Sequence, residues 1–261
     1  MVIKMKILEE CKKQKIKVAV FDFDGTISTL RCGWESVMEP LMLEILYGDD
    51  PREEQVEYVR SYISASTGIQ TILQMKWISE ELTKMGREVL SPWDYKAEYN
   101  RRLMENVEKR RQYALEGHRD DFIMKGSEKF LSELKARGVK LYAASGTDDA
   151  DVKKEAEILG IAKYFDEIAG AMPFSEDCSK EATLKRLISM GGSEGLLVVG
   201  DGPVEIRLGR EVGASTIGIV GKEKERCGFD AVKVERLTKA GAHILCDCFE
   251  NSKEIFDFLE G

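Results

Sequence analysis

The sequence predicts an α/β fold, a doubly wound parallel sheet with a helical cap inserted after the first strand. Two observations lead to this fold class. Short runs that are apolar on both faces recur with helical patterns between them, as is typical of a parallel sheet covered by helices. Residues 30–120 interrupt this alternation, because they carry helical patterns and no β-branched strand run.

Six short segments have the composition of buried strands, and most of them end in Asp, Ser or Gly. They are residues 17–22, 139–145, 167–170, 196–201, 215–220 and 242–245. Each is apolar along both faces, which is expected of strands that are covered on both sides. The segment 196–201 is the clearest of the six, and 167–170 is the weakest.

Helical patterns follow most of these strands. In 127–137 the residues Phe130, Leu131 and Leu134 form one apolar stripe, with Ser127 as the expected N-cap and Gly138 as the stop. Three further helices are expected at 179–190, 204–212 and 251–260. Strands that alternate with helices in this way predict parallel pairing.

The stretch after the first strand has a different organisation. Four long helical patterns follow one another there, at 34–47, 52–64, 69–84 and 94–115, with breaks at 66–68 and 91–92. We therefore expect two domains. Residues 1–29 and 121–261 would form the sheet domain, and residues 30–120 would form a helical cap.

Composition excludes several classes of protein. The chain has 39 basic and 47 acidic residues, a net charge of −8, which argues against a surface that binds nucleic acid. No apolar run reaches the length of a membrane span, and the N-terminal residues lack the apolar core of a secretory signal. We therefore expect a cytoplasmic protein that works as a monomer or homodimer, without nucleic-acid or membrane partners.

The six cysteines are scattered along the chain and do not form a disulfide pattern. His243, Cys246 and Cys248 could be metal ligands, but a fourth ligand is missing and the segment has the alternation of a buried strand. We interpret these cysteines as structural.

The first strand ends in an acidic pair. Asp22 and Asp24 are two residues apart, so in an extended chain both side chains face the same side. Two carboxylates this close repel each other unless a cation or a shared proton offsets the repulsion, and Mg²⁺ prefers such oxygen ligands. Gly25 allows close approach of the backbone. An ordinary surface turn is also typical of Asp-Gly, so this motif alone leaves both readings open.

Three other segments place polar residues at the same edge of the sheet. Asp201 ends another strand, and Glu205 follows in the first turn of a helix, where the helix dipole alone also favours an acid. Ser145 ends the strand at 139–145, and Gly146 follows it. Lys180 opens a helix, where its charge opposes the dipole, and this suggests that it binds a phosphate or the carboxylates.

These four motifs, in this order, resemble those of the haloacid dehalogenase superfamily of phosphotransferases. The resemblance covers residues 15–30 and 120–250, and the insert between the first two motifs looks like the family's type 1 helical cap. The resemblance implies that Asp22 is the nucleophile and Asp24 the general acid and base. Mg²⁺ would be held by the Asp22 carboxylate, the Asp24 backbone carbonyl and Asp201. Relatives more often carry Asp where this chain has Glu205, which leaves open whether Glu205 also binds the metal.

The resemblance further implies that Ser145, Gly146 and Lys180 hold the phosphoryl oxygens, and that Thr26 orients the turn or bonds to Asp24. The expected activity is magnesium-dependent hydrolysis of a small phosphorylated metabolite, such as a sugar phosphate, through an aspartyl-phosphate. A phosphomutase or phosphotransferase on the same scaffold is one alternative. A non-catalytic phosphate-sensing module is another, although such modules are shorter, lack a cap and do not need Asp24.

In the cap, one helix entrance combines a glycine with Gln70, Thr71 and Gln74. Amide and hydroxyl groups suit a sugar-like polyol, so these residues are candidates for substrate binding. An exposed helix face would have the same composition, and the pattern does not separate the two interpretations.

Overall fold

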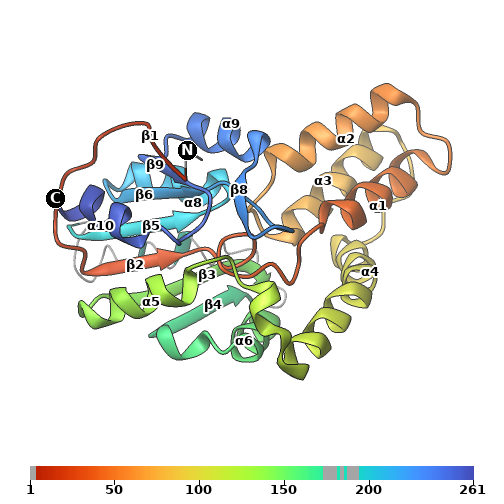
Figure 1. Ribbon diagram of the computed structural model, residues 1–261. Helices are drawn as coiled ribbons and strands as arrows, with labels where there is room; N and C mark the ends of the chain where they lie inside the picture. The colour runs from red at the N-terminus through yellow and green to blue at the C-terminus, as the bar shows by residue number, and fades with distance from the viewer. Residues whose placement is uncertain (1–3, 173–180, 183–184, 187–193) are drawn as a thin grey trace.

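The computed structural model describes residues 4–172, 181–182, 185–186 and 194–261. Its main sheet has seven strands in the order β1-β9-β6-β5-β2-β3-β4 (Figure 1). All neighbouring pairs are parallel except β1 and β9, which are antiparallel. The strands are β1 (Met5–Ile7), β2 (Val18–Phe21), β3 (Lys140–Asp148), β4 (Glu167–Ala171), β5 (Leu196–Gly200), β6 (Ser215–Ile219) and β9 (Ile244–Cys246).

The predicted α/β class is confirmed, and the six expected strands are β2, β3, β4, β5, β6 and β9. The sequence prediction missed β1, so the helical insertion follows the second strand of the chain. It also missed a hairpin of β7 (Gly221–Lys222) and β8 (Cys227–Phe229). These strands are only two or three residues long, which is too short for an alternation to be recognised.

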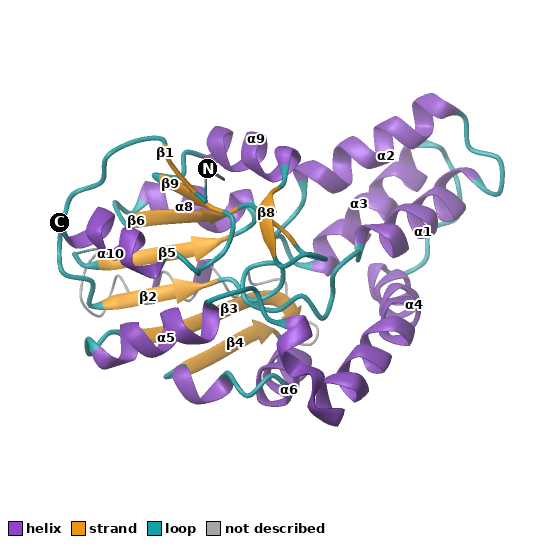
Figure 2. Cartoon of the chain, in the orientation of Figure 1, coloured by secondary structure: helices purple, strands orange, loops and turns teal. Residues whose placement is uncertain are grey.

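Helices cover both faces of the sheet (Figure 2). On one face α5 (Ser127–Ala136), α6 (Asp149–Ile158) and α10 (Ser252–Glu260) share an apolar cluster with the strands, and on the other α8 (Pro203–Glu211) and α9 (Ala231–Ala240) pack on the sheet. The N-cap of α5 is Gly126 and not Ser127. Gly126 has a φ of 80°, and a Cβ there would overlap the backbone of Phe249, so only glycine fits.

The insertion helices are α1 (Glu35–Tyr47), α2 (Glu53–Ala65), α3 (Thr71–Lys84) and α4 (Pro92–Tyr113), and they lie together at one end of the sheet (Figure 1). They pack around an apolar cluster of their own, which includes Met38, Leu41, Met75, Ile78 and Tyr99. A π-helical turn at Ala114–His118, a 3-10 turn at Arg119–Phe122 and α5 lead the chain back to β3. No helix of the described residues is long and apolar enough to cross a membrane.

The strand order brings the expected motifs together. Strand β2 lies between β5 and β3, with Phe21 opposite both Val199 and Ala143. The residues that follow β2 and β5, and those at the end of β3, therefore meet at one edge of the sheet, the edge that faces the insertion helices (Figure 1).

Candidate active site

A buried carboxylate cluster lies at this edge. Oxygens of Asp22, Asp201 and Glu205 lie within 4.8 Å of one another, and all three residues are buried. The Asp22 backbone N–H donates to the Val199 carbonyl at 2.8 Å, which fixes the turn after β2 to the neighbouring strand. Gly25 has a φ of 73°, and a Cβ there would overlap the Asp201 carboxylate, so a glycine is needed for the two loops to approach.

Glu205 belongs to this cluster and also caps its own helix. Its Oε1 accepts a hydrogen bond of 2.7 Å from the Gly202 backbone N–H at the start of α8. A Cβ at Gly200 would overlap the Glu205 side chain, so the strand end is shaped around this carboxylate. In one conformation Glu205 can therefore both cap the N-terminus of α8 and offer a carboxylate oxygen to a metal ion.

Three buried carboxylates at this spacing need positive charge. Lys233 of α9 supplies part of it, because its Nζ lies 2.8 Å from Asp201 Oδ2 and 2.9 Å from Glu223 Oε1. Burial lowers the pKa of Lys233, but Asp201 and Glu223 outweigh burial and raise it overall. The remaining donor set consists of hard oxygen ligands, which fits a divalent cation such as Mg²⁺. The sequence prediction missed Lys233, since it has the pattern of a solvated helix lysine.

Asp24 lies outside this cluster and has different neighbours. Its Oδ2 accepts hydrogen bonds from the hydroxyls of Ser145 at 3.0 Å and Thr147 at 2.8 Å. Its Oδ1 is buried and lies 3.9 Å from Arg31 Nε. Burial raises the pKa of Asp24 to about 6, although Arg31 opposes the rise. This carboxyl group can therefore hold or release a proton near neutral pH.

The other predicted site residues have the following neighbours in the described part of the chain. The Thr26 hydroxyl donates to Asp201 Oδ1 at 3.4 Å, and not to Asp24. Ser145, expected to hold phosphoryl oxygens, donates to Asp24. Gly146 lies under the insertion, where a Cβ would be 3.0 Å from the Ile69 carbonyl oxygen. Lys180 lies outside the residues that the structure describes.

A cavity of about 100 Å³ lies between the sheet edge and the insertion helices. Asp22, Asp24, Ser145, Gly146 and Asp201 line it from the sheet. From the other side it is lined by Trp34, Thr67, Thr71, Gln74, Tyr99 and Leu103. This pocket therefore brings five of the predicted metal and phosphate residues together with Thr71 and Gln74 of the predicted substrate set. Glu205 and Thr26 are not among its lining residues.

The interpretation of Gln70, Thr71 and Gln74 as an exposed helix face is wrong for the two amides. Gln70 and Gln74 are only 1% and 4% exposed. Gln74 lines the cavity and donates to the Ser66 hydroxyl at 3.1 Å, whereas Gln70 lies beside Gly146 and is not a lining residue. Thr71 is half-buried and lines the cavity.

Comparison with known proteins agrees with this geometry. A family model described as haloacid dehalogenase-like hydrolase matches residues 16–213. The chain belongs to this family of hydrolases. The match includes the loops that follow β2, β3 and β5, and so it covers the carboxylate cluster and the Ser145 segment.

Curated relatives and solved structures extend the comparison. A candidate pyrophosphatase of Clostridium perfringens, PpaX, is 27% identical over 198 residues, which are 73% of this chain and 85% of the relative. A phosphoglycolate phosphatase of Vibrio parahaemolyticus is 24% identical over 213 residues, 79% of this chain and 85% of the relative. The crystal structure of a predicted phosphatase from Clostridium acetobutylicum superimposes with a TM-score of 0.61 at 17% identity, over 94% of this chain and 98% of that one. The structural match supports the fold.

Proposed function

We propose that the protein is a magnesium-dependent phosphatase that hydrolyses a small phosphorylated metabolite through an aspartyl-phosphate. The observation behind the proposal is that two carboxylates, two residues apart, face one cavity from different electrostatic surroundings. Asp22 lies among carboxylates and beside a cation site, which favours its charged form once the cation is bound. Asp24 is held by two hydroxyls in a buried position that favours its protonated form.

Asp22 is suited to be the nucleophile. The Phe23 backbone N–H donates to its Oδ1 at 2.8 Å, which holds the carboxylate in one orientation at the floor of the cavity. Attack on phosphorus would form an aspartyl-phosphate and release the alcohol. Mg²⁺, held by Asp22, the Asp24 carbonyl, Asp201 and Glu205, would neutralise the carboxylates and the phosphoryl charge.

Asp24 is suited to move the proton. In the first step it gives its proton to the leaving oxygen, so that an alcohol departs rather than an alkoxide. In the second step the same carboxylate takes a proton from the water that attacks the phosphorus of the aspartyl-phosphate, and this regenerates Asp22 and the protonated Asp24. A pKa near 6 serves both directions.

The cavity favours a substrate whose leaving group is small, hydroxylated and uncharged. Among its described lining residues the one cation is Arg31, and Arg31 is already paired with Glu155 at 2.7 Å. The insertion contributes hydroxyl and amide groups from Thr67, Thr71 and Gln74, and an apolar side from Trp34, Tyr99 and Leu103. A second phosphate or a carboxylate would lack a cationic partner on this side, whereas a polyol such as a sugar would find hydrogen bonds and a ring surface.

The test is a phosphate-release assay of the parent and Asp22→Asn with sugar and glycerol phosphates, 2-phosphoglycolate and pyrophosphate, in magnesium and in a chelator. We expect release from sugar or glycerol phosphates by the parent in magnesium alone. A preference for phosphoglycolate or pyrophosphate would contradict the uncharged leaving group. Full activity of Asp22→Asn would contradict the nucleophile, and isomerised sugar phosphate without phosphate release would indicate a phosphomutase.

A further inference from the structure

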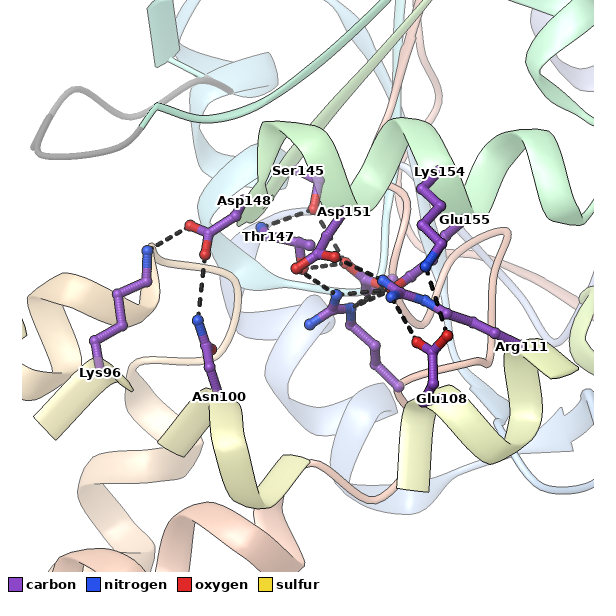
Figure 3. Close-up of polar contacts among 12 residues, drawn as sticks. Lys96, Asn100, Glu108, Arg111, Ser145, Thr147, Asp148, Asp151, Lys154 and Glu155 are labelled. Atoms are coloured by element: carbon purple, nitrogen blue, oxygen red, sulfur yellow. Dashed lines mark hydrogen bonds and ion pairs between the residues drawn. The ribbon is translucent and has the colours of Figure 1, made fainter. Parts of the chain in front are cut away.

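A buried ion cluster connects the insertion with the sheet domain. Its centre is Glu155 of α6, which is 0% exposed. Arg31, in the loop between β2 and α1, donates to both Glu155 carboxylate oxygens, with its shortest contact at 2.7 Å. Arg111 of α4 donates to Glu155 Oε1 at 2.6 Å and to Asp151 Oδ1 at 2.8 Å. Figure 3 shows Arg111 reaching from α4 to Asp151 and Glu155 on α6.

This cluster also contacts Asp24. The Arg31 Nε lies 3.9 Å from Asp24 Oδ1, while Ser145 and Thr147 hold Oδ2. Asp24 Oδ1 is buried and accepts no hydrogen bond from any residue that the structure describes. The guanidinium of Arg31 thus lies beside the Asp24 oxygen that the two hydroxyls do not bind.

Arg31 and Arg111 can pair with the same carboxylates, so the position of Arg31 depends on Arg111. Arg31 Nη2 also lies 3.5 Å from Asp151 Oδ2, whereas Arg111 Nη2 lies 2.8 Å from Asp151 Oδ1. With Arg111 in place, Asp151 is paired from α4, and Arg31 is shared between Glu155 and Asp24. Without Arg111, the two carboxylates of α6 would have Arg31 as their remaining partner in the cluster, and their charge would draw the guanidinium away from Asp24.

We propose that Arg31 and Glu155 are positioning residues for Asp24, and that Arg111 makes this positioning depend on the docking of α4 against α6. The inference rests on the proposed function, in which Asp24 transfers the proton. The insertion then contributes to the chemistry from a distance: its docked position sets the geometry of a proton carrier that belongs to the sheet domain.

The first test compares two leaving groups. Arg111→Met removes the link from α4 while leaving Glu155 paired with Arg31, so the protein is expected to fold. An alkyl phosphate needs protonation of its leaving oxygen, whereas p-nitrophenolate leaves readily without it. We therefore expect kcat/KM to fall about tenfold or more for the alkyl phosphate and less than about threefold for p-nitrophenyl phosphate.

Lys154→Met is the matched control. Lys154 and Glu108 form an ion pair of 3.5 Å between the same two helices, α6 and α4, and both side chains are more than half exposed (Figure 3). Glu108 also pairs with Arg111 at 3.0 Å, and Lys154→Met leaves that pair and the contacts of Arg111 with Asp151 and Glu155 in place. Its kcat/KM should equal that of the parent for both substrates. Equal losses on both substrates in Arg111→Met would overturn the inference, because a general loss of folded enzyme has that signature.

The second test uses a double substitution that avoids an unpaired buried charge. Arg31→Met together with Glu155→Met replaces the buried pair by apolar side chains of similar length. In the parent background it should reproduce the selective loss on the alkyl phosphate. In an Asp24→Asn background it should cause no further loss in the residual rate of phosphorylation by the alkyl phosphate, because Asn cannot transfer the proton.

An additive loss in that background would show that the cluster acts on the fold and not through Asp24, and would overturn the inference. If the parent hydrolysed no phosphate ester at all, the proposed function would fail, and the inference with it. Normal hydrolysis by a parent whose variants lose both substrates equally would overturn the inference alone.

Discussion

Removing one charge from the carboxylate cluster should stabilise the protein without metal, and magnesium should cancel this advantage. In Asp22→Asn the amide oxygen can still accept the hydrogen bond from the Phe23 N–H, so the substitution removes charge and little else. At 4.8 Å and an effective dielectric of about 20, two carboxylates repel by roughly 3.5 kcal/mol. Lys233 offsets part of this through Asp201. We therefore expect Asp22→Asn to raise the free energy of unfolding by about 1–3 kcal/mol in a chelator.

In magnesium the free energy of unfolding of the parent should rise until it matches that of Asp22→Asn. A ligand present at 100 times its dissociation constant stabilises the folded state by about 2.7 kcal/mol, and the variant lacks one of the ligands. The measurement is urea unfolding of both proteins at pH 7.5, in a chelator and in 10 mM magnesium. Turnover of phosphate esters should be abolished in the variant, since an amide is a poor nucleophile.

Asp247→Asn is the control for this experiment. Asp247 is also buried, and its Oδ2 accepts from the Gly228 N–H at 3.0 Å, but it does not belong to the cluster. Its effect on stability should be the same in both buffers. Two results would refute the reasoning: a loss of stability of Asp22→Asn in the chelator, or a stabilisation by magnesium as large in the variant as in the parent.

Three further outcomes are expected. Gly25→Ala should weaken magnesium binding in a calorimetric titration and cost about 1–2 kcal/mol of stability from its positive φ, whereas Gly126→Ala should cost stability alone. Thr71→Val and Gln74→Ala should each lower kcat/KM for the physiological substrate about 2- to 12-fold, the equivalent of one hydrogen bond, and leave p-nitrophenyl phosphate hydrolysis unchanged. Burial, assisted by Arg210, lowers the pKa of His243, so the unfolded chain binds more protons in mild acid. The contribution of His243 to the free energy of unfolding should therefore fall as the pH drops below about 6.5, whereas the raised pKa of Asp24 acts in the opposite direction. The difference between the parent and His243→Gln, measured across this pH range, isolates the His243 part.

The fold and the carboxylate cluster could be predicted because their signals are local. Asp22 and Asp201 each follow an apolar strand, and parallel strands end at the same edge, so sequence position alone brings them together. The same argument placed Ser145 at that edge. It could not give the hydrogen-bond partner of Ser145 or Thr26, because small differences in side-chain position decide which carboxylate accepts each hydrogen bond.

The ion cluster could not be predicted, because nothing in its sequence marks it. Arg31 and Glu155 are 124 positions apart, and Arg111 lies in a run of charged residues that has the composition of a solvated helix face. Only the docking of α4 on α6 buries these charges and makes them partners. Lys233 is a similar case, since its pairing with Asp201 depends on how α9 packs beside α8 and β9.

Two separate charge arrangements therefore act on carboxylates that are neighbours in the sequence. Asp22 belongs to an acidic cluster that could hold a metal ion, and a bound cation would favour its charged form. Asp24 points to two hydroxyls and a guanidinium that is shared with Glu155, and its pKa of about 6 allows it to carry a proton. Environments that separate the pKa values of two acids define which one acts as nucleophile and which as acid. The surroundings of Asp24 include Arg31 and, through Glu155, Arg111 of α4, a helix that also contributes Tyr99 and Leu103 to the cavity. In the proposed mechanism the role of Asp24 therefore depends on this helix.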